Sequence, residues 1–306
     1  METPVNVNQF RPVAKDIQMA QTIARPSTTY WQDARRRLKK NPLAMIGLFV
    51  IIIMVLGAII GPFFCKYNYS DQDYDNRLAS PSKEHWFGTD NLGRDLFVRV
   101  LYGARISLAI GFFASLINLT IGVLYGSISG YFGGRVDNVM MRIVDVIYTV
   151  PLTMVVILLM VLFQPGLKNI LIALGLVYWI GMARIVRGQV LAIKEQEYVL
   201  AARMVGANKW RIMLKHLIPN SMGPIIVSAT LNIPQAIFQE AFLSFIGLGV
   251  AAPMASWGVL ADEGAQAIQS YPHLLFFPAA AICITMLAFN FLGDGLRDAL
   301  DPRMRR

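Results

Sequence analysis

Charged side chains, cysteine and histidine are all scarce in this chain of 306 residues. Only 15% of the residues are Asp, Glu, Lys or Arg, and 55% are apolar. Soluble domains carry about 25% charged residues, so an ordinary soluble enzyme is disfavoured and a chain filled by membrane spans is favoured. Two cysteines exclude a disulfide framework and a cysteine-rich metal site. The three histidines lie far apart with no ligand spacing, and no metal-binding residue is predicted.

Motifs for catalysis are also missing. No Gly-Lys pair occurs anywhere in the chain. A phosphate-binding loop of the type Gly-x4-Gly-Lys-Ser/Thr is therefore absent, and we expect the chain to hydrolyse no ATP itself. No Ser/His/Asp or Cys/His arrangement is readable, and we predict no catalytic residue. The first 42 residues are polar and lack the pattern of a cleaved signal peptide.

Long apolar runs are what the sequence has in abundance. Six of them are long enough to predict membrane helices, and hence an all-α membrane protein with six spans. The predicted spans are 43–64, 108–131, 146–163, 170–186, 222–243 and 274–293. The third and fourth are close to the lower length limit for spanning and are joined by only a few residues, as in a tight helical hairpin.

Lys and Arg are unevenly distributed between the two sides of these spans. An even number of spans puts both termini on one side, and that side carries 21 of the 28 basic residues. Such an excess marks the cytoplasmic side. The net charge of +9 then reflects basic cytoplasmic loops, not a nucleic-acid partner. The cluster 35–40 before the first span fits this orientation; specific binding of anionic lipid is its alternative role.

These expectations divide the chain into five parts. They are a cytoplasmic N-terminal segment (1–42), the first span (43–64), an extracytoplasmic segment (65–107), a five-helix core (108–293) that includes a cytoplasmic loop (187–221), and a cytoplasmic tail (294–306). In the extracytoplasmic segment we expect an amphipathic surface helix, capped by Thr89 or Asp90. Asp95 and Arg99 are spaced for an i,i+4 pair on it.

Three features inside the spans stand out. Gly122, Gly126 and Gly130 share one helix face, which predicts close approach of another backbone. Arg142 and Asp145 are spaced to neutralise each other at the membrane edge. Polar residues on one face of the fifth span form a candidate translocation pathway, because intramembrane polar groups tend to face a wet cavity; the alternative is hydrogen bonding between helices. The stripe consists of Asn232, Gln235 and Gln239, with Glu240 just beyond.

The cytoplasmic loop predicts a helix, a break and a second helix. Good helix formers occupy 197–205, and Gly206 can end that helix in a left-handed conformation. Asn208 can cap the next helix, whose end we expect just before Pro219. Two short helices at a sharp bend outside the membrane would form a protruding knob. A helix-turn-helix that binds DNA would need its own three-helix domain. A partner protein is therefore favoured over DNA, and over a loop that only connects two spans.

The pattern Ala201-Ala202-x3-Gly206 followed by Pro219 resembles the coupling loop of ABC importer permeases. It departs from the general motif, because Leu200 stands where Glu is usual, and His216 and Ile218 also differ. The form found here is similar to the oligopeptide, dipeptide and nickel branch of that family, and its C-type permease subunits above all. Further segments that resemble this branch are 31–37, 88–95, 182–189, 242–249, 256–258 and 293–302.

The resemblance implies the fold of type I ABC importer permeases and a role in oligopeptide import across the cytoplasmic membrane. It implies a paralogous permease as partner, two ATPase subunits that bind ATP and Mg²⁺, and a peptide-binding protein outside; this chain would hold no cofactor. It also implies which residues couple the spans to the ATPases. These are Glu197, Tyr198, Ala201, Ala202, Gly206, Ala207 and Pro219. Import of dipeptides or nickel is the alternative within the family, and a stand-alone channel or secondary transporter is the alternative outside it.

Overall fold

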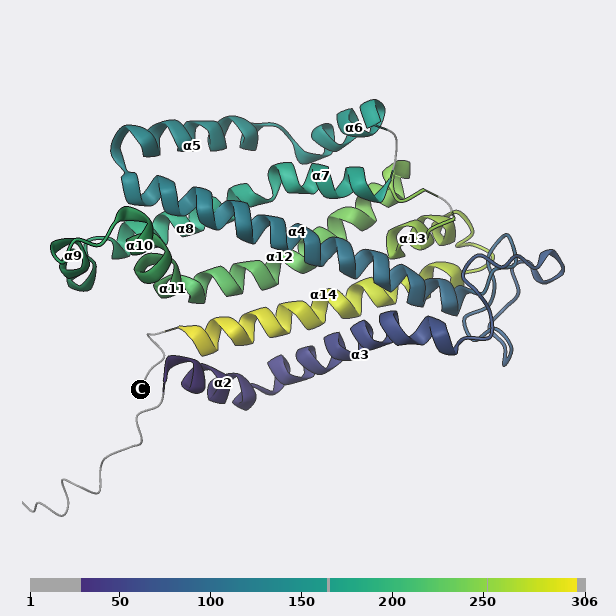
Figure 1. Cartoon of the computed structure of the whole chain (residues 1–306). Coiled ribbons are helices and arrows are strands. Elements are labelled where there is room, and N and C mark those ends of the chain that lie inside the picture. The colour runs from purple at the N-terminus through teal and green to yellow at the C-terminus, as the bar shows by residue number, and fades with distance from the viewer. Residues whose placement is uncertain (1–28, 164–165, 252, 302–306) are drawn as a thin grey trace, which may run out of the picture.

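The structure, a computed structural model, describes residues 29–163, 166–251 and 253–301; the rest of the predicted N-terminal segment and tail lies outside the described residues. Its regular elements are helices, as predicted, apart from an isolated bridge between Thr89 and Asp95. Figure 1 shows an elongated bundle with short helices at both ends. The elements are α2 (Tyr30–Lys40), α3 (Pro42–Phe64), η2 (Tyr74–Asn76), α4 (Leu96–Phe132), α5 (Gly134–Thr149), α6 (Leu152–Phe163), α7 (Leu167–Val177), α8 (Trp179–Ile193), α9 (Glu197–Met204), α10 (Lys209–Ile212), the π-helix η3 (Met213–Leu217), α11 (Ile218–Asn220), α12 (Met222–Leu243), the π-helix η4 (Ser244–Leu248), α13 (Trp257–Gln266) and α14 (His273–Leu300).

Helix α4 runs through the middle of the bundle and packs against α8, α12 and α3 (Figure 1). Its contact with α8 depends on the three buried glycines. A Cβ atom added to Gly126 would lie 2.4 Å from the carbonyl oxygen of Ala183, and one added to Gly122 would lie 2.5 Å from Cβ of Met182. Neither position has room for a methyl group, so the prediction of close backbone approach is confirmed.

The apolar helices agree only in part with the six predicted spans. Within the described ranges, α3, α4, α7 together with α8, and α14 are long and apolar enough to cross a membrane. A fifth candidate is the pair α5 and α6, which is bent by 76°. The bend falls at Pro151, whose ring disfavours a helical conformation for Val150 and which donates no backbone hydrogen bond. Helix α12 has 22 residues but is not in this apolar set, because its polar stripe lowers its hydropathy.

The N-terminal end of α4 differs from the prediction. The surface helix and the second span are one continuous helix, and its cap is Asp95, which accepts a hydrogen bond from the Val98 amide at 2.9 Å. Asp90 instead closes the turn before it by accepting from the amides of Leu92 and Arg94. Thr89 and Asp90 are thus not the helix cap that the sequence predicted.

The predicted Asp95–Arg99 pair is also wrong. The second carboxylate oxygen of Asp95 lies 2.8 Å from Nδ1 of His85. The buried guanidinium of Arg99 contacts Asp90 and donates to Glu263 of α13 at 2.6 Å. Asp90, Arg99 and Glu263 therefore join the segment before α4 to α4 and α13. Arg99 and Glu263 are 164 residues apart in the sequence, so no local spacing could predict their contact.

At the opposite end of the bundle, Asp145 pairs with a different arginine from the one expected. Its carboxylate accepts a hydrogen bond from Arg184 at 2.9 Å, and not from Arg142 within the described part of the chain. The pair joins α5 to α8. Val144 of α5 packs in one buried cluster with Ile180 and Ala183 of α8, and this packing brings Arg184 close to Asp145.

Candidate functional site

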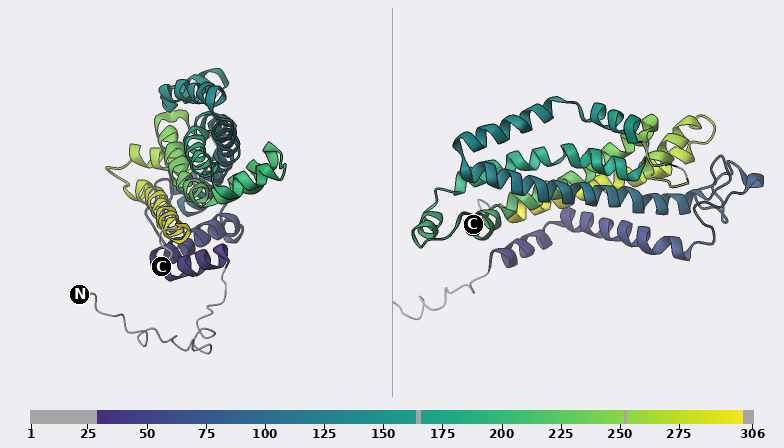
Figure 2. Two further views of the ribbon diagram at one scale, coloured as in Figure 1. Left: turned by 90° about the vertical axis from the view of Figure 1, so that its left-hand side faces the viewer. Right: turned by 45° about the horizontal axis from the view of Figure 1, so that its top comes forward.

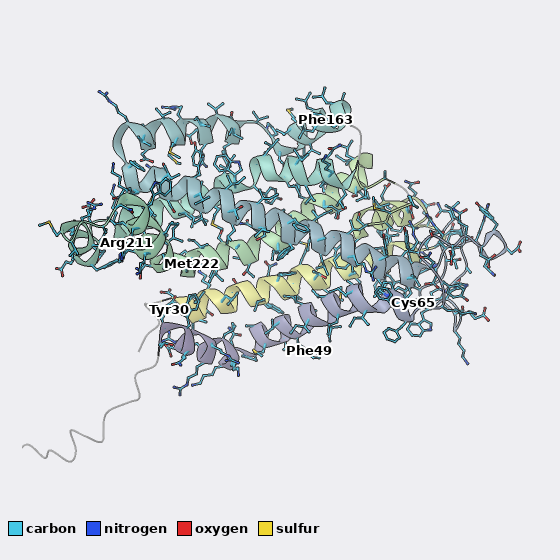
Figure 3. All side chains as sticks on the ribbon, viewed as in Figure 1. Tyr30, Phe49, Cys65, Phe163, Arg211 and Met222 are labelled. Atoms are coloured by element: carbon cyan, nitrogen blue, oxygen red, sulfur yellow. The ribbon has the colours of Figure 1, made fainter. Side chains whose placement is uncertain are left out.

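The most prominent feature outside the bundle is the helical segment 197–220, which we call the knob. It consists of α9, α10, η3 and α11 and projects from one end of the bundle (Figures 1 and 2). Arg211 of the knob and Tyr30 of α2 lie at this end, while Cys65 lies at the opposite end (Figure 3). The helix–break–helix pattern that the sequence predicted for this loop is confirmed.

The knob is fastened to the bundle by a buried apolar cluster. Val199 of α9 and Ile212, Met213 and Leu217 of the second helical stretch are at most 1% exposed. They pack in one cluster with residues of α8 and with Ile225 of α12. The knob and the helices α8 and α12 therefore share one packed cluster, and cores of this kind have low compressibility.

The bend of the knob is set by Gly206, whose φ is +85°. The Gly206 amide donates to the Arg203 carbonyl at 2.9 Å, and the Ala207 amide donates to the Ala202 carbonyl at 3.0 Å. This pair of bonds is the Schellman ending of a helix, which favours glycine at the left-handed position. Asn208 then caps α10 by accepting from the Arg211 amide at 2.7 Å. The predicted roles of Gly206 and Asn208 are both confirmed.

Pro219 does not follow the end of the second helix, as the sequence predicted. It lies within α11, directly after the π-helix Met213–Leu217, so the helical stretch continues to Asn220. A π-helix closes its hydrogen bonds over five residues and is inserted as single turns. A helix tolerates proline in its first turn, where no intrahelical donor is needed. The switch from π to α at this point accommodates Pro219 without a break.

The outward face of the knob is apolar at its tip. Met204 and Val205 are each 89% exposed, and Trp210 and Leu214 are more than half exposed. Such a group is characteristic of a surface that binds another protein. The sequence did not single out these four residues, because apolar residues in short helices are ordinarily read as core. Four basic residues of the knob, Arg203, Lys209, Arg211 and Lys215, are exposed, so an acidic partner surface would be complementary to it.

The residues expected to couple the knob to a partner fall into two groups. Glu197, Tyr198, Ala201, Gly206 and Pro219 are exposed, whereas Ala202 and Ala207 are half-buried against the apolar cluster. Desolvation raises the pKa of the Tyr198 phenol, which therefore stays protonated and can donate a hydrogen bond at neutral pH. The first group could contact a partner, and the second sets the packing beneath it.

A partly buried ion pair fixes the helices beneath the knob. Both carboxylate oxygens of Asp137 in α5 accept hydrogen bonds of 2.6 Å from Arg187 of α8, and Ser129 of α4 donates to the same carboxylate. Bidentate pairs of this kind restrict both distance and orientation. Three helices are thus held at the point where the chain leaves α8 for the knob.

A cavity of about 690 Å³ runs along α12 at the end of the bundle that carries the knob. Asn232 and Gln235 of the predicted pathway stripe line it, together with Ser228 and with Arg297 of α14. Gln239 is half-buried and is not among the lining residues. The sequence did not single out Ser228 or Arg297 for this role, because the approach of α14 to α12 is a tertiary contact.

Glu240 is separated from the rest of the stripe. Its carboxylate is fully buried and accepts hydrogen bonds from Ser107 at 3.0 Å and Ser244 at 2.7 Å. Ser107 also accepts from the Trp257 amide at the start of α13. Glu240 therefore joins α4, α12 and α13 and does not line the cavity. In the described residues, no three His, Cys, Asp or Glu side chains are grouped to hold a metal ion.

Two family models match the chain. The model described as "Binding-protein-dependent transport system inner membrane component" matches residues 122–306. The model described as "N-terminal TM domain of oligopeptide transport permease C" matches residues 29–81. The first covers the knob, the cavity and the partly buried ion pair, and the second covers α2 and α3.

Relatives match nearly the whole chain. The oligopeptide transport system permease protein OppC of Bacillus subtilis (strain 168) is 54% identical over 98% of this chain and 98% of its own. The dipeptide transport system permease protein DppC of the same strain is 57% identical over 94% of this chain and 90% of its own. Among solved structures, an inward-facing MetNI methionine ABC transporter matches with a TM-score of 0.56 at 18% identity, over 67% of this chain and 96% of that one. The last match shows the fold alone.

Proposed function

The chain belongs to the family of binding-protein-dependent transport system inner membrane components, and from that premise we propose that it imports peptides as one half of a permease pair. It is a permease subunit of an ABC importer and a multi-pass protein of the inner membrane, and the ATPase of such importers is a separate subunit. The observation that carries the coupling role is the knob, with its fixed bend and its exposed apolar tip.

Peptides are the proposed substrates because the two similar relatives are named for oligopeptide and dipeptide transport. Nickel import is the alternative within the family. Cells that lack the gene and then regain it should recover uptake of a labelled tripeptide or dipeptide. Recovery of nickel uptake without peptide uptake would refute the peptide assignment.

The proposed assembly contains a paralogous permease, two ATPases that bind ATP and Mg²⁺, and an extracytoplasmic binding protein. We expect the tagged chain, extracted in mild detergent, to co-purify with the second permease and both ATPases. A chain that remains alone under gentle extraction would instead support a channel or a secondary transporter. The binding protein found with the complex would report the substrate class independently.

The proposed topology has six spans with both termini in the cytoplasm. Four of the six proposed spans are the apolar helices α3, α4, α7 with α8, and α14. The other two are helix α12 and the bent pair α5 and α6. Segment 65–107 is then outside, and the knob, α2 and the tail are inside. In a cysteine-free background, Asn208→Cys should resist a membrane-impermeant maleimide applied to intact cells and Ser82→Cys should react. The reverse pattern would invert the topology.

The knob is proposed to bind an ATPase subunit through Met204 and Val205, with Glu197, Tyr198, Ala201 and Pro219 around them. Gly206, Ala202 and Ala207 keep the bend and the packing. Burial of both apolar side chains would contribute about 3–4 kcal/mol to binding, and a buried aspartate would oppose it.

The substitution Met204→Asp should therefore remove the ATPases from the purified complex and leave the permease pair intact. Tyr74→Asp is the matched control, because Tyr74 is also more than half exposed but lies in the segment at the other end of the bundle. Unchanged recovery of the ATPases with Met204→Asp would contradict the proposed contact.

The pathway is proposed to pass along α12. Asn232 and Gln235 line the cavity, and Gln239 continues the same helix face. A peptide backbone needs hydrogen-bond partners within the membrane. Replacing all three by alanine should reduce peptide uptake with the complex intact. Glu240 was a candidate for this pathway, but its buried hydrogen bonds support a structural role. Wild-type uptake by the triple variant would contradict the pathway and would support a structural role for the three amides too.

Alternating access is the mechanism that we propose. ATP binding would bring the ATPases together and move the two knobs inward, and the helices packed on each knob, α8 and α12, would follow. The cavity that opens at the knob end would close, and a path would open outside. Hydrolysis would reverse the change and release the peptide inside.

A further inference from the structure

The cavity along α12 has a chemically distinct mouth. Gly223, at the start of α12, lies against the last residue of α14, since a Cβ on Gly223 would be 3.5 Å from the Leu300 carbonyl oxygen. Arg297 lies one turn before Leu300 and lines the cavity from this end. Gln235 lies 12 residues further along α12, or about 18 Å at 1.5 Å per residue. The cavity thus has a cation at this end and amides further along α12.

Four polar side chains that line this cavity have no partner within the described chain. The side chains of Ser228, Asn232, Gln235 and Arg297 make no hydrogen bond or ion pair there; Asp301, which also lines the mouth, has interactions of its own. Five other arginines, Arg37, Arg94, Arg99, Arg184 and Arg187, each lie within ion-pair distance of a carboxylate. Unpaired polar groups in a cavity are groups that a ligand can satisfy.

Building on the proposed peptide import, we propose that Arg297 binds the terminal carboxylate of the peptide at the cytoplasmic mouth of the pathway, while Asn232 and Gln235 bind backbone amides. A guanidinium presents parallel N–H donors that match the two oxygens of a carboxylate. An asparagine or glutamine amide both donates and accepts, as a peptide backbone requires. An extended chain of about five residues spans the distance between the two ends of the cavity.

This arrangement would act on every peptide irrespective of its side chains. The terminal carboxylate is common to all unmodified peptides, and the amides of the backbone are too. A residue that recognises the carboxylate would therefore retain broad substrate range. Arg297 is a specificity-determining residue for the free carboxyl terminus in this proposal.

The simpler role for Arg297 is stabilisation of the α14 C-terminus, where a cation interacts favourably with the helix dipole. The two roles differ in their dependence on the substrate. A role in the helix affects all substrates equally, whereas carboxylate binding affects only those with a free carboxylate. Lysine at position 297 would retain the charge in both roles but would lose the bidentate geometry.

The test compares one tripeptide as its free acid and as its C-terminal amide, in proteoliposomes that hold the whole importer with its binding protein. Uptake by each variant is divided by wild-type uptake of the same peptide, which removes the binding protein's own preference. We expect Arg297→Gln to lower uptake of the acid by at least about tenfold, as loss of a charge-assisted hydrogen bond implies, and to leave the amide nearly unchanged. Arg297→Lys should be intermediate for the acid.

Arg36→Gln is the matched control, because Arg36 is an exposed arginine of α2 at the same end of the bundle and does not line the cavity. Equal loss for acid and amide with Arg297→Gln, no loss with it, or the same selective loss with Arg36→Gln would each overturn the proposal. A wild-type importer that takes up neither peptide would refute the peptide function itself, which is a different result.

Discussion

Replacing Gly206 by valine tests the knob at its most constrained point. Gly206 has φ of +85°, and both hydrogen bonds of the helix ending depend on this conformation. A Cβ atom at this position would meet nothing within 4 Å. The substitution therefore creates no clash within the described chain, and its effect on the chain's own fold is conformational.

The free-energy cost of valine at position 206 can be calculated from the left-handed conformation alone. An L-residue in this region is disfavoured by about 1–2 kcal/mol, and a β-branched residue lies at the upper end. If ATPase binding requires the bend seen here, affinity falls by about 5- to 30-fold. If the loop instead relaxes, Met204 and Val205 are displaced relative to α10, and binding falls further. Asparagine tolerates the left-handed region and should recover most of the loss.

The assay is titration of purified ATPase onto the permease pair in nanodiscs, for Gly206→Val, Gly206→Asn and a control. The control is Gly188→Val, because Gly188 is an exposed glycine of α8 with open space around it and no left-handed φ. Wild-type affinity for Gly206→Val would refute the reasoning. So would an asparagine variant as weak as the valine variant, since backbone conformation would then not be the cause.

Three further predictions concern stability, measured by thermal unfolding in detergent through tryptophan fluorescence. Asp137→Asn should cost about 2–3 kcal/mol, because it leaves Arg187 without its bidentate partner; an unchanged transition would show that the pair contributes nothing. Gly126→Val should be destabilising by at least about 1–3 kcal/mol, because α8 must move away, and Gly188→Val is its control. Glu263→Gln should cost about 1–2 kcal/mol by weakening the contact of Arg99 with α13; a gain in stability would contradict the structural role assigned to these charges.

Local features of the knob were predictable because their causes are local. A glycine that ends one helix and an asparagine that caps the next act within a few residues, and both were confirmed at Gly206 and Asn208. The glycine stripe on α4 was predictable for a similar reason, since helical spacing alone puts Gly122, Gly126 and Gly130 on one face. Pro219 was the exception, because a π-helix has no sequence signal of comparable strength.

Charge pairs were the part that sequence spacing predicted poorly. Asp95 with Arg99, and Asp145 with Arg142, were spaced for helical pairing, yet each carboxylate lies with a partner on another element. A helical pair in water is worth only about 0.3–0.5 kcal/mol. A partner from another part of the chain replaces the helical neighbour when packing brings it closer to the carboxylate and less water surrounds the pair.

The sequence alone was sufficient to predict that the chain is helical and apolar and that the knob bends at Gly206, because hydropathy, helix caps and glycine conformation depend on neighbours in the chain. Which side chains of the polar stripe share a cavity could not be predicted from the sequence and became visible only in the folded structure. Asn232 and Gln235 line one cavity with Arg297, whereas Glu240 is buried and accepts hydrogen bonds from two serines. The physical reason is that burial and partnership depend on which helices pack side by side, and periodicity along one helix carries no information about its neighbours.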